Sequence, residues 1–97
     1  MDQIKRITYM EDNLNKVSQA VEELEAAFEN YESIQKNWKE LLAYYDSRQW
    51  RRDFEDDEAG KLPADLRRGV LSEDAVYNLL TENQRLLERI QNYIEEP

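Results

Sequence analysis

The chain contains no cysteine and no histidine. The missing cysteines exclude disulfides, thiolate zinc sites and a cysteine nucleophile. The missing histidines remove the commonest general base and the commonest metal ligand, so no Ser-His or Cys-His catalytic arrangement can form. We therefore expect a protein that is not an enzyme and that holds no metal and no cofactor.

Long apolar runs and helix-breaking residues are also scarce. The longest apolar run, Leu41 to Tyr45, is far too short to cross a bilayer. No apolar stretch of signal-peptide length follows the N-terminus, so we expect a cytoplasmic protein without membrane association. Both glycines and one of the two prolines lie within residues 47–71. The segments on either side of that region are free to form uninterrupted helices.

Basic residues are few compared with acidic ones. The chain has 13 Lys and Arg against 22 Asp and Glu, which gives a net charge of −9. The acidic excess lies in residues 1–46 and 72–97, whereas residues 47–71 hold six residues of each sign. An acidic surface repels phosphate backbones, so we do not expect direct binding of nucleic acid.

Residues 3–46 carry a heptad pattern. Thirteen positions follow alternating spacings of four and three residues, and eleven of them are apolar or aromatic. They are Gln3, Ile7, Met10, Leu14, Val17, Val21, Leu24, Phe28, Tyr31, Gln35, Trp38, Leu42 and Tyr45. A pattern of this length is typical of helices that wrap around one another. It predicts one long helix over residues 3–46, which could divide in two near residues 30–33.

Residues 72–95 are predicted to form a C-terminal helix. Ser72 is a suitable N-cap, and Glu73 and Asp74 place negative charge at the positive end of the helix dipole. Leu71 and Val76 have the spacing of a hydrophobic staple across the helix start. The predicted fold class is therefore all-α and a single domain. The C-terminal helix would pack antiparallel on the long helix, as a helical hairpin or as a three-helix bundle.

Residues 47–71 are predicted to be an irregular, charged connection. A basic cluster is followed by an acidic run: Arg48, Arg51 and Arg52, then Asp53, Glu55, Asp56, Asp57 and Glu58. Residues 59–63 have the composition of a turn. Residues 63–68 could form one helical turn, which Gly69 would end in the left-handed conformation.

Several of these segments resemble a small bacterial family known only as domain of unknown function 4298. The resemblance rests on Tyr44-Tyr45, on Trp50, on Asp53 with the acids after it, and on residues 68–77, which contain the string Gly-Val-Leu-Ser-Glu-Asp. It covers nearly the whole chain and implies a bacterial source. It implies no activity, cofactor or site, because none is assigned to the family.

The candidate contact residues surround the charged connection. They are Tyr44, Tyr45, Trp50, Arg51, Arg52, Arg67 and Arg68. The aromatic residues could form a partner hot spot, but core where the connection folds over the helices is the favoured interpretation. The arginines could bind a phosphate or carboxylate, but the balanced charge of the connection favours pairing within the chain. The acidic run lacks the Gly and Glu spacing of a calcium loop, and we interpret it as solvated.

Three functional hypotheses remain open. The leading one is an interaction or structural module that binds a protein partner or a second copy of itself, as a homodimer through the heptad positions. The second is an acidic mimic of nucleic acid that inhibits a DNA-binding protein. The third is a histidine-free enzyme that uses carboxylate, tyrosine and arginine side chains.

Overall fold

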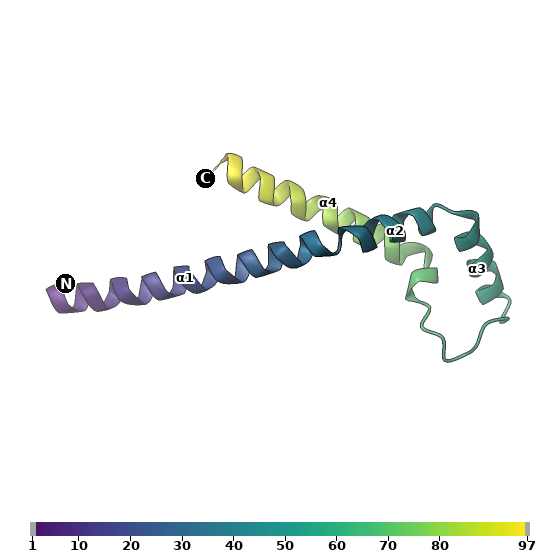
Figure 1. Ribbon diagram of the computed structural model, residues 1–97, viewed down its shortest axis with the longest axis horizontal. Coiled ribbons are helices and arrows are strands. Elements are labelled where there is room, and N and C mark those ends of the chain that lie inside the picture. The colour runs from purple at the N-terminus through teal and green to yellow at the C-terminus, as the bar shows by residue number, and fades with distance from the viewer. Residues whose placement is uncertain (1, 97) are drawn as a thin grey trace. The chain divides into compact units, whose positions relative to one another are not determined.

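The computed structural model describes residues 2–96, which form four α-helices and one short 3-10 helix and contain no β-strand (Figure 1). The helices are α1 (Gln3–Ser33), α2 (Gln35–Tyr45), α3 (Arg48–Glu58), η1 (Gly69–Leu71) and α4 (Glu73–Glu95). This architecture confirms the predicted all-α fold. Within the same residues no helix is both long and apolar enough to cross a membrane.

The chain divides into two units, Met1–Glu40 and Leu41–Pro97. The first unit contains α1 and the beginning of α2, and the second contains the rest of α2 with α3, η1 and α4. The predicted single domain and the antiparallel packing of the C-terminal helix stay predictions.

The first unit is built on α1, which Figure 1 shows as one straight helix. Its 31 residues contain no glycine and no proline. Asp2 occupies the N-cap, where its carboxylate accepts a hydrogen bond from the backbone amide of Lys5 at 2.8 Å. The cap satisfies one of the unpaired amides of the first turn and places negative charge at the positive end of the helix dipole.

The predicted continuous helix over residues 3–46 is interrupted at Ile34. This residue is a turn with φ −96° and ψ 10°, and α2 begins directly after it. Two side chains donate hydrogen bonds to backbone carbonyls at this point. The Ser33 hydroxyl donates to the Asn30 carbonyl at 2.6 Å, and the Gln35 side-chain amide donates to the Tyr31 carbonyl at 3.0 Å. These bonds compete with the regular backbone ladder, which explains why the helix divides here.

The connection predicted to be irregular over residues 47–71 instead begins with a helix, α3. Ser47 is its N-cap, and the hydroxyl accepts a hydrogen bond from the Trp50 amide at 3.2 Å. Residues 48–58 contain no glycine or proline and are mostly Arg, Gln, Glu and Asp. The charge clusters suggested a loop, but most of these residue types form helices readily once a cap is provided.

A glycine in the left-handed conformation ends α3. Gly60 has φ 72°, its amide donates to the Asp57 carbonyl at 3.0 Å, and the Lys61 amide donates to the Asp56 carbonyl at 3.0 Å. This pair of bonds is the Schellman motif, which requires a left-handed residue. Gly69 was expected to take the left-handed conformation at the end of a helical turn over residues 63–68, but it begins η1 without a positive φ. The turn predicted at residues 59–63 is thus present, and the left-handed Gly69 is not.

The core of the second unit lies where η1 meets α4. Among the described residues only Leu71 and Val76 are buried, with 7% and 3% of their surface exposed. They are the two residues whose spacing predicted a hydrophobic staple. Ser72 occupies the predicted N-cap position with an extended backbone, but its side chain makes no capping hydrogen bond. Packing of the staple therefore accounts for the start of α4 better than the serine hydroxyl does.

Candidate functional site

A row of exposed apolar side chains, which we call the α1 stripe, runs along α1 in the first unit. It consists of the following residues: Ile7, Met10, Leu14, Val17, Val21, Leu24 and Phe28. Their exposed fractions run from 56% at Met10 to 70% at Leu24. Because they follow the heptad spacing, all seven lie along one face of the helix.

Polar and small residues border the α1 stripe. On one border lie Glu11, Ser18, Glu25 and Glu32, and on the other lie Arg6, Asn13, Ala20 and Ala27. No ion pair within residues 2–96 involves Arg6 or any of these glutamates. The two borders thus differ in charge, with three carboxylates on one and a single guanidinium on the other.

The second candidate surface, in the second unit, is an aromatic cluster of Tyr45, Trp50 and Phe54. The Tyr45 and Trp50 ring centroids are 5.2 Å apart in an edge-on arrangement, and the Trp50 and Phe54 rings stack at 5.3 Å. All three side chains are half-buried. Such ring pairs add packing energy beyond the area that they bury.

The polar atoms of this aromatic cluster are already used within the chain. The Trp50 indole nitrogen donates to the Val70 carbonyl at 2.8 Å, and the Tyr45 hydroxyl donates to the Glu73 carbonyl at 3.0 Å. These bonds join α2 and α3 to the segment that starts α4. The arrangement matches the core interpretation of the aromatic residues, since their rings and polar groups hold the unit together.

Tyr44 lies in the last turn of α2. Its hydroxyl donates a hydrogen bond to the Asp53 carboxylate on α3. Burial and, next, this hydrogen bond to a negatively charged group raise the pKa of Tyr44 to about 12. The Tyr44 carbonyl also accepts a hydrogen bond from the Ser47 hydroxyl at 2.5 Å. Tyr44 therefore stays protonated at neutral pH and fixes the turn between the two helices.

The structure separates the roles of the candidate arginines. Arg68 pairs with Asp57 of α3 and donates further hydrogen bonds to the carbonyls of Leu66 at 3.3 Å and Pro63 at 2.5 Å. These contacts hold residues 61–68 near α3. The Arg68–Asp57 ion pair is of the kind expected from the balanced charge of the connection. Arg51 and Arg52 on α3 and Arg67 in the connection are exposed, and no ion pair within residues 2–96 involves them. Their role as contact residues stays a prediction.

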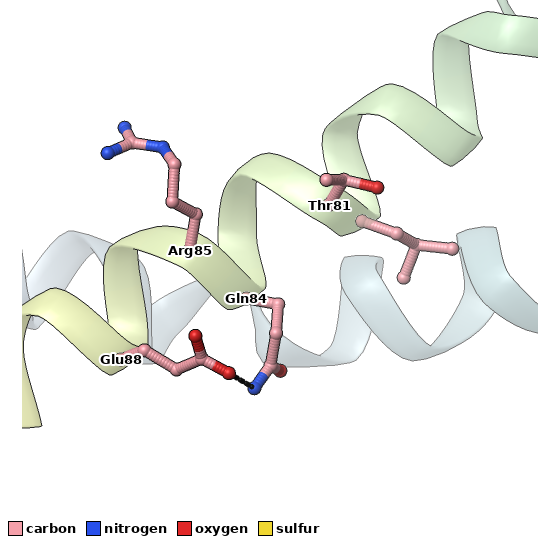
Figure 2. A pocket seen from close by; sticks show the side chains of 5 residues that line it. Thr81, Gln84, Arg85 and Glu88 are labelled. Atoms are coloured by element: carbon pink, nitrogen blue, oxygen red, sulfur yellow. Dashed lines mark hydrogen bonds between the residues drawn. The ribbon is translucent and has the colours of Figure 1, made fainter.

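Two shallow hollows lie on the second unit. Figure 2 shows one of them on α4, where Thr81, Gln84, Arg85 and Glu88 come from a single helix and the Gln84 amide donates to the Glu88 carboxylate at 2.9 Å. The other is lined by the following residues: Phe54, Asp57, Glu58, Arg68, Leu71, Ser72, Glu73 and Asp74. Within the described residues no three acidic side chains form a group that could hold a metal ion.

Residues 7–93 match the family model described as domain of unknown function DUF4298. The chain belongs to that family. The match confirms the resemblance noted in the sequence and covers nearly the whole chain, but the family description assigns no activity. No curated protein and no protein of solved structure matches this DUF4298 member.

The helix-capping roles of two residues of this DUF4298 member were missed in the sequence, although one of them lies in the turn predicted at residues 59–63. Ser47 caps α3, and Gly60 ends it. A signal for both existed, because Ser47 and Gly60 enclose twelve residues that contain no glycine or proline. The high density of arginine and acidic residues instead led to the prediction of a loop.

Proposed function

We propose that this protein is a protein–protein interaction module without catalytic activity, and that the α1 stripe is its binding surface. The observation that carries the proposal is the exposure of the seven stripe residues, each more than half open to solvent. Soluble monomers rarely expose contiguous apolar patches larger than about a few hundred Å², and larger patches mark interaction sites. A straight helical row of this kind favours a partner that also presents a helix.

The two other hypotheses have less support. A nucleic-acid mimic needs a continuous surface of carboxylates, whereas one face of α1 is a row of exposed apolar side chains. An enzyme needs carboxylates whose pKa values are set apart in a shared pocket. On α3, Asp53 and Asp57 instead join Tyr44 and Arg68 in contacts that shape the second unit, and Asp56 pairs with Lys61.

A matched pair of variants tests the proposal. Leu24→Glu places a charge within the α1 stripe, and Ala26→Glu places the same charge two residues away, on the opposite face of the helix. Glutamate forms helices readily, so both variants keep α1 helical. The measurement is quantitative recovery of binding partners from cells that express the tagged chain, including an untagged copy of the chain itself.

The expected result is a partner that binds the wild type and the Ala26→Glu variant and is lost with Leu24→Glu. Recovery that is the same for all three proteins would contradict the proposal.

A further inference from the structure

We infer that the partner of the α1 stripe is a second copy of this chain, bound as a parallel, in-register coiled coil. The inference rests on the proposed function and adds the identity and the direction of the partner. Three observations carry it: the size of the stripe, the residue types at its core positions and the charges along its two borders.

The stripe is large enough for a stable pair. The 31 residues of α1 extend about 46 Å at about 1.5 Å per residue. With on the order of 100 Å² exposed on each of seven residues, the stripe presents on the order of 700 Å², close to the ~800 Å² that each partner buries in a standard interface. A second copy supplies a surface of the same length and spacing, so every stripe residue is covered at once.

The residue types at the core positions are compatible with two parallel strands. Ile7, Leu14, Val21 and Phe28 occupy the first core position of successive heptads, and Met10, Val17 and Leu24 occupy the second. β-Branched residues at the first position combined with leucine at the second favour two-stranded pairing, and Ile7, Val21 and Leu24 follow that preference. In a parallel pair in register, each of these residues packs against its own copy.

The border charges decide the direction. In a parallel pair, the border of Arg6 on one helix faces the border of Glu11 on the other, and the two guanidinium–carboxylate contacts are attractive. The remaining facing positions of a parallel pair join uncharged residues to each other or to a glutamate: Asn13 with Ser18, Ala20 with Glu25, and Ala27 with Glu32. No like charges meet.

In an antiparallel pair, each border of the α1 stripe faces the same border of the partner helix. With the two helices fully overlapped, Glu11 of each helix would face Glu25 of the other, while Arg6 would lie on the other border of the interface. Like charges that face each other across a helix interface oppose pairing and specify direction. The α1 borders therefore favour the parallel arrangement over the antiparallel one.

The absence of cysteine from the chain makes the direction directly measurable. Met10→Cys and Leu24→Cys each introduce one thiol at a core position. In the parallel pair each new thiol lies beside its own copy, within the ~4.4–6.8 Å between Cα atoms that a disulfide requires. In a fully overlapped antiparallel pair residue 10 lies opposite residue 28, so the two thiols of Met10→Cys are about 27 Å apart along the axis.

The experiment combines sedimentation with oxidation of the full chain. We expect the wild type and Ala26→Glu to sediment as dimers at micromolar concentration, and Leu24→Glu to dissociate at least tenfold more readily. Met10→Cys and Leu24→Cys should each form a covalent dimer with itself under mild oxidation. In an equimolar mixture with one variant carrying a tag, disulfides between the two different variants should stay rare.

Two results would overturn the inference. Failure of both Met10→Cys and Leu24→Cys to form covalent dimers under the same oxidation, while the wild type sediments as a dimer, would show that the pair is not parallel and in register. A wild type that sediments only as a monomer up to about 100 μM would show that the partner is not a second copy. If the wild type is a monomer but a different protein binds it and Leu24→Glu abolishes that binding, the proposed function still holds. If no partner that depends on the α1 stripe is recovered, both the inference and the proposed function are wrong.

Discussion

The indole nitrogen of Trp50 donates a hydrogen bond to the backbone carbonyl of Val70, at 2.8 Å, across twenty residues of chain. The bond ties α3 to η1, and through η1 to the start of α4, where the core residues Leu71 and Val76 are buried. The second unit therefore depends on a contact between segments far apart in the sequence.

Replacing Trp50 with phenylalanine tests this contact. The variant keeps a ring between Tyr45 and Phe54 but leaves the Val70 carbonyl without its donor. We expect the free energy of unfolding to fall by about 1–3 kcal/mol, the usual cost of an unsatisfied, part-buried polar group together with lost packing. The measurement is the urea midpoint by circular dichroism. Tyr45→Phe is the control, because its hydrogen bond to Glu73 is exposed and its loss should cost less. Equal effects of the two substitutions would count against a special role for Trp50.

Tyr44 gives the protein a pH dependence in the alkaline range. Its folded-state pKa of about 12 lies above the ordinary value of 10.0, so the phenol binds its proton more tightly in the folded than in the unfolded chain. The stabilisation is fully present below pH 10 and is lost as the pH rises from 10 to 12. Absorbance titration of the phenolate should show one late-ionising tyrosine that Tyr44→Phe removes. If all six tyrosines of the wild type titrate near pH 10, the contact with Asp53 is not maintained in solution.

The two glycines should respond differently to alanine. Gly60 has φ 72°, a conformation that costs an L-residue about 1–2 kcal/mol, so Gly60→Ala should destabilise α3 by roughly that amount even though a Cβ would meet no atom within 4 Å. Gly69 has no positive φ and an equally open environment, so Gly69→Ala should be neutral or stabilise by up to about 1 kcal/mol. Thermal unfolding of the two variants measures the difference. The reverse order would contradict the Schellman ending of α3.

The serines that precede α3 and α4 form a second matched pair. The Ser47 hydroxyl accepts the Trp50 amide, so Ser47→Ala should cost about 1 kcal/mol. The Ser72 side chain makes no capping bond, so Ser72→Ala should change the urea midpoint very little, in contrast to the cap loss that the Leu71-Ser72-Glu73-Asp74 sequence suggests. A larger loss of stability at Ser72 than at Ser47 would reverse the assignment.

The features that the sequence alone determined are those set by short-range spacing. The heptad positions place the α1 stripe on one face because every residue of a helix advances by the same angle, whatever else the chain does. The staple residues Leu71 and Val76 could be identified because they are separated by a single helical turn and its cap. The all-α class followed from segments without glycine or proline.

Only the tertiary structure decided which polar groups meet. The division of the first helix at Ile34 depends on whether the Ser33 and Gln35 side chains turn back to the backbone, and both residues are equally compatible with a continuous helix. The end of α3 at Gly60, and the pairing of Arg68 rather than Arg67 with Asp57, depend on how the connection folds back on α3. Such choices are made by small energy differences between alternative hydrogen-bond partners, and the partners come within reach of one another only after the chain has folded.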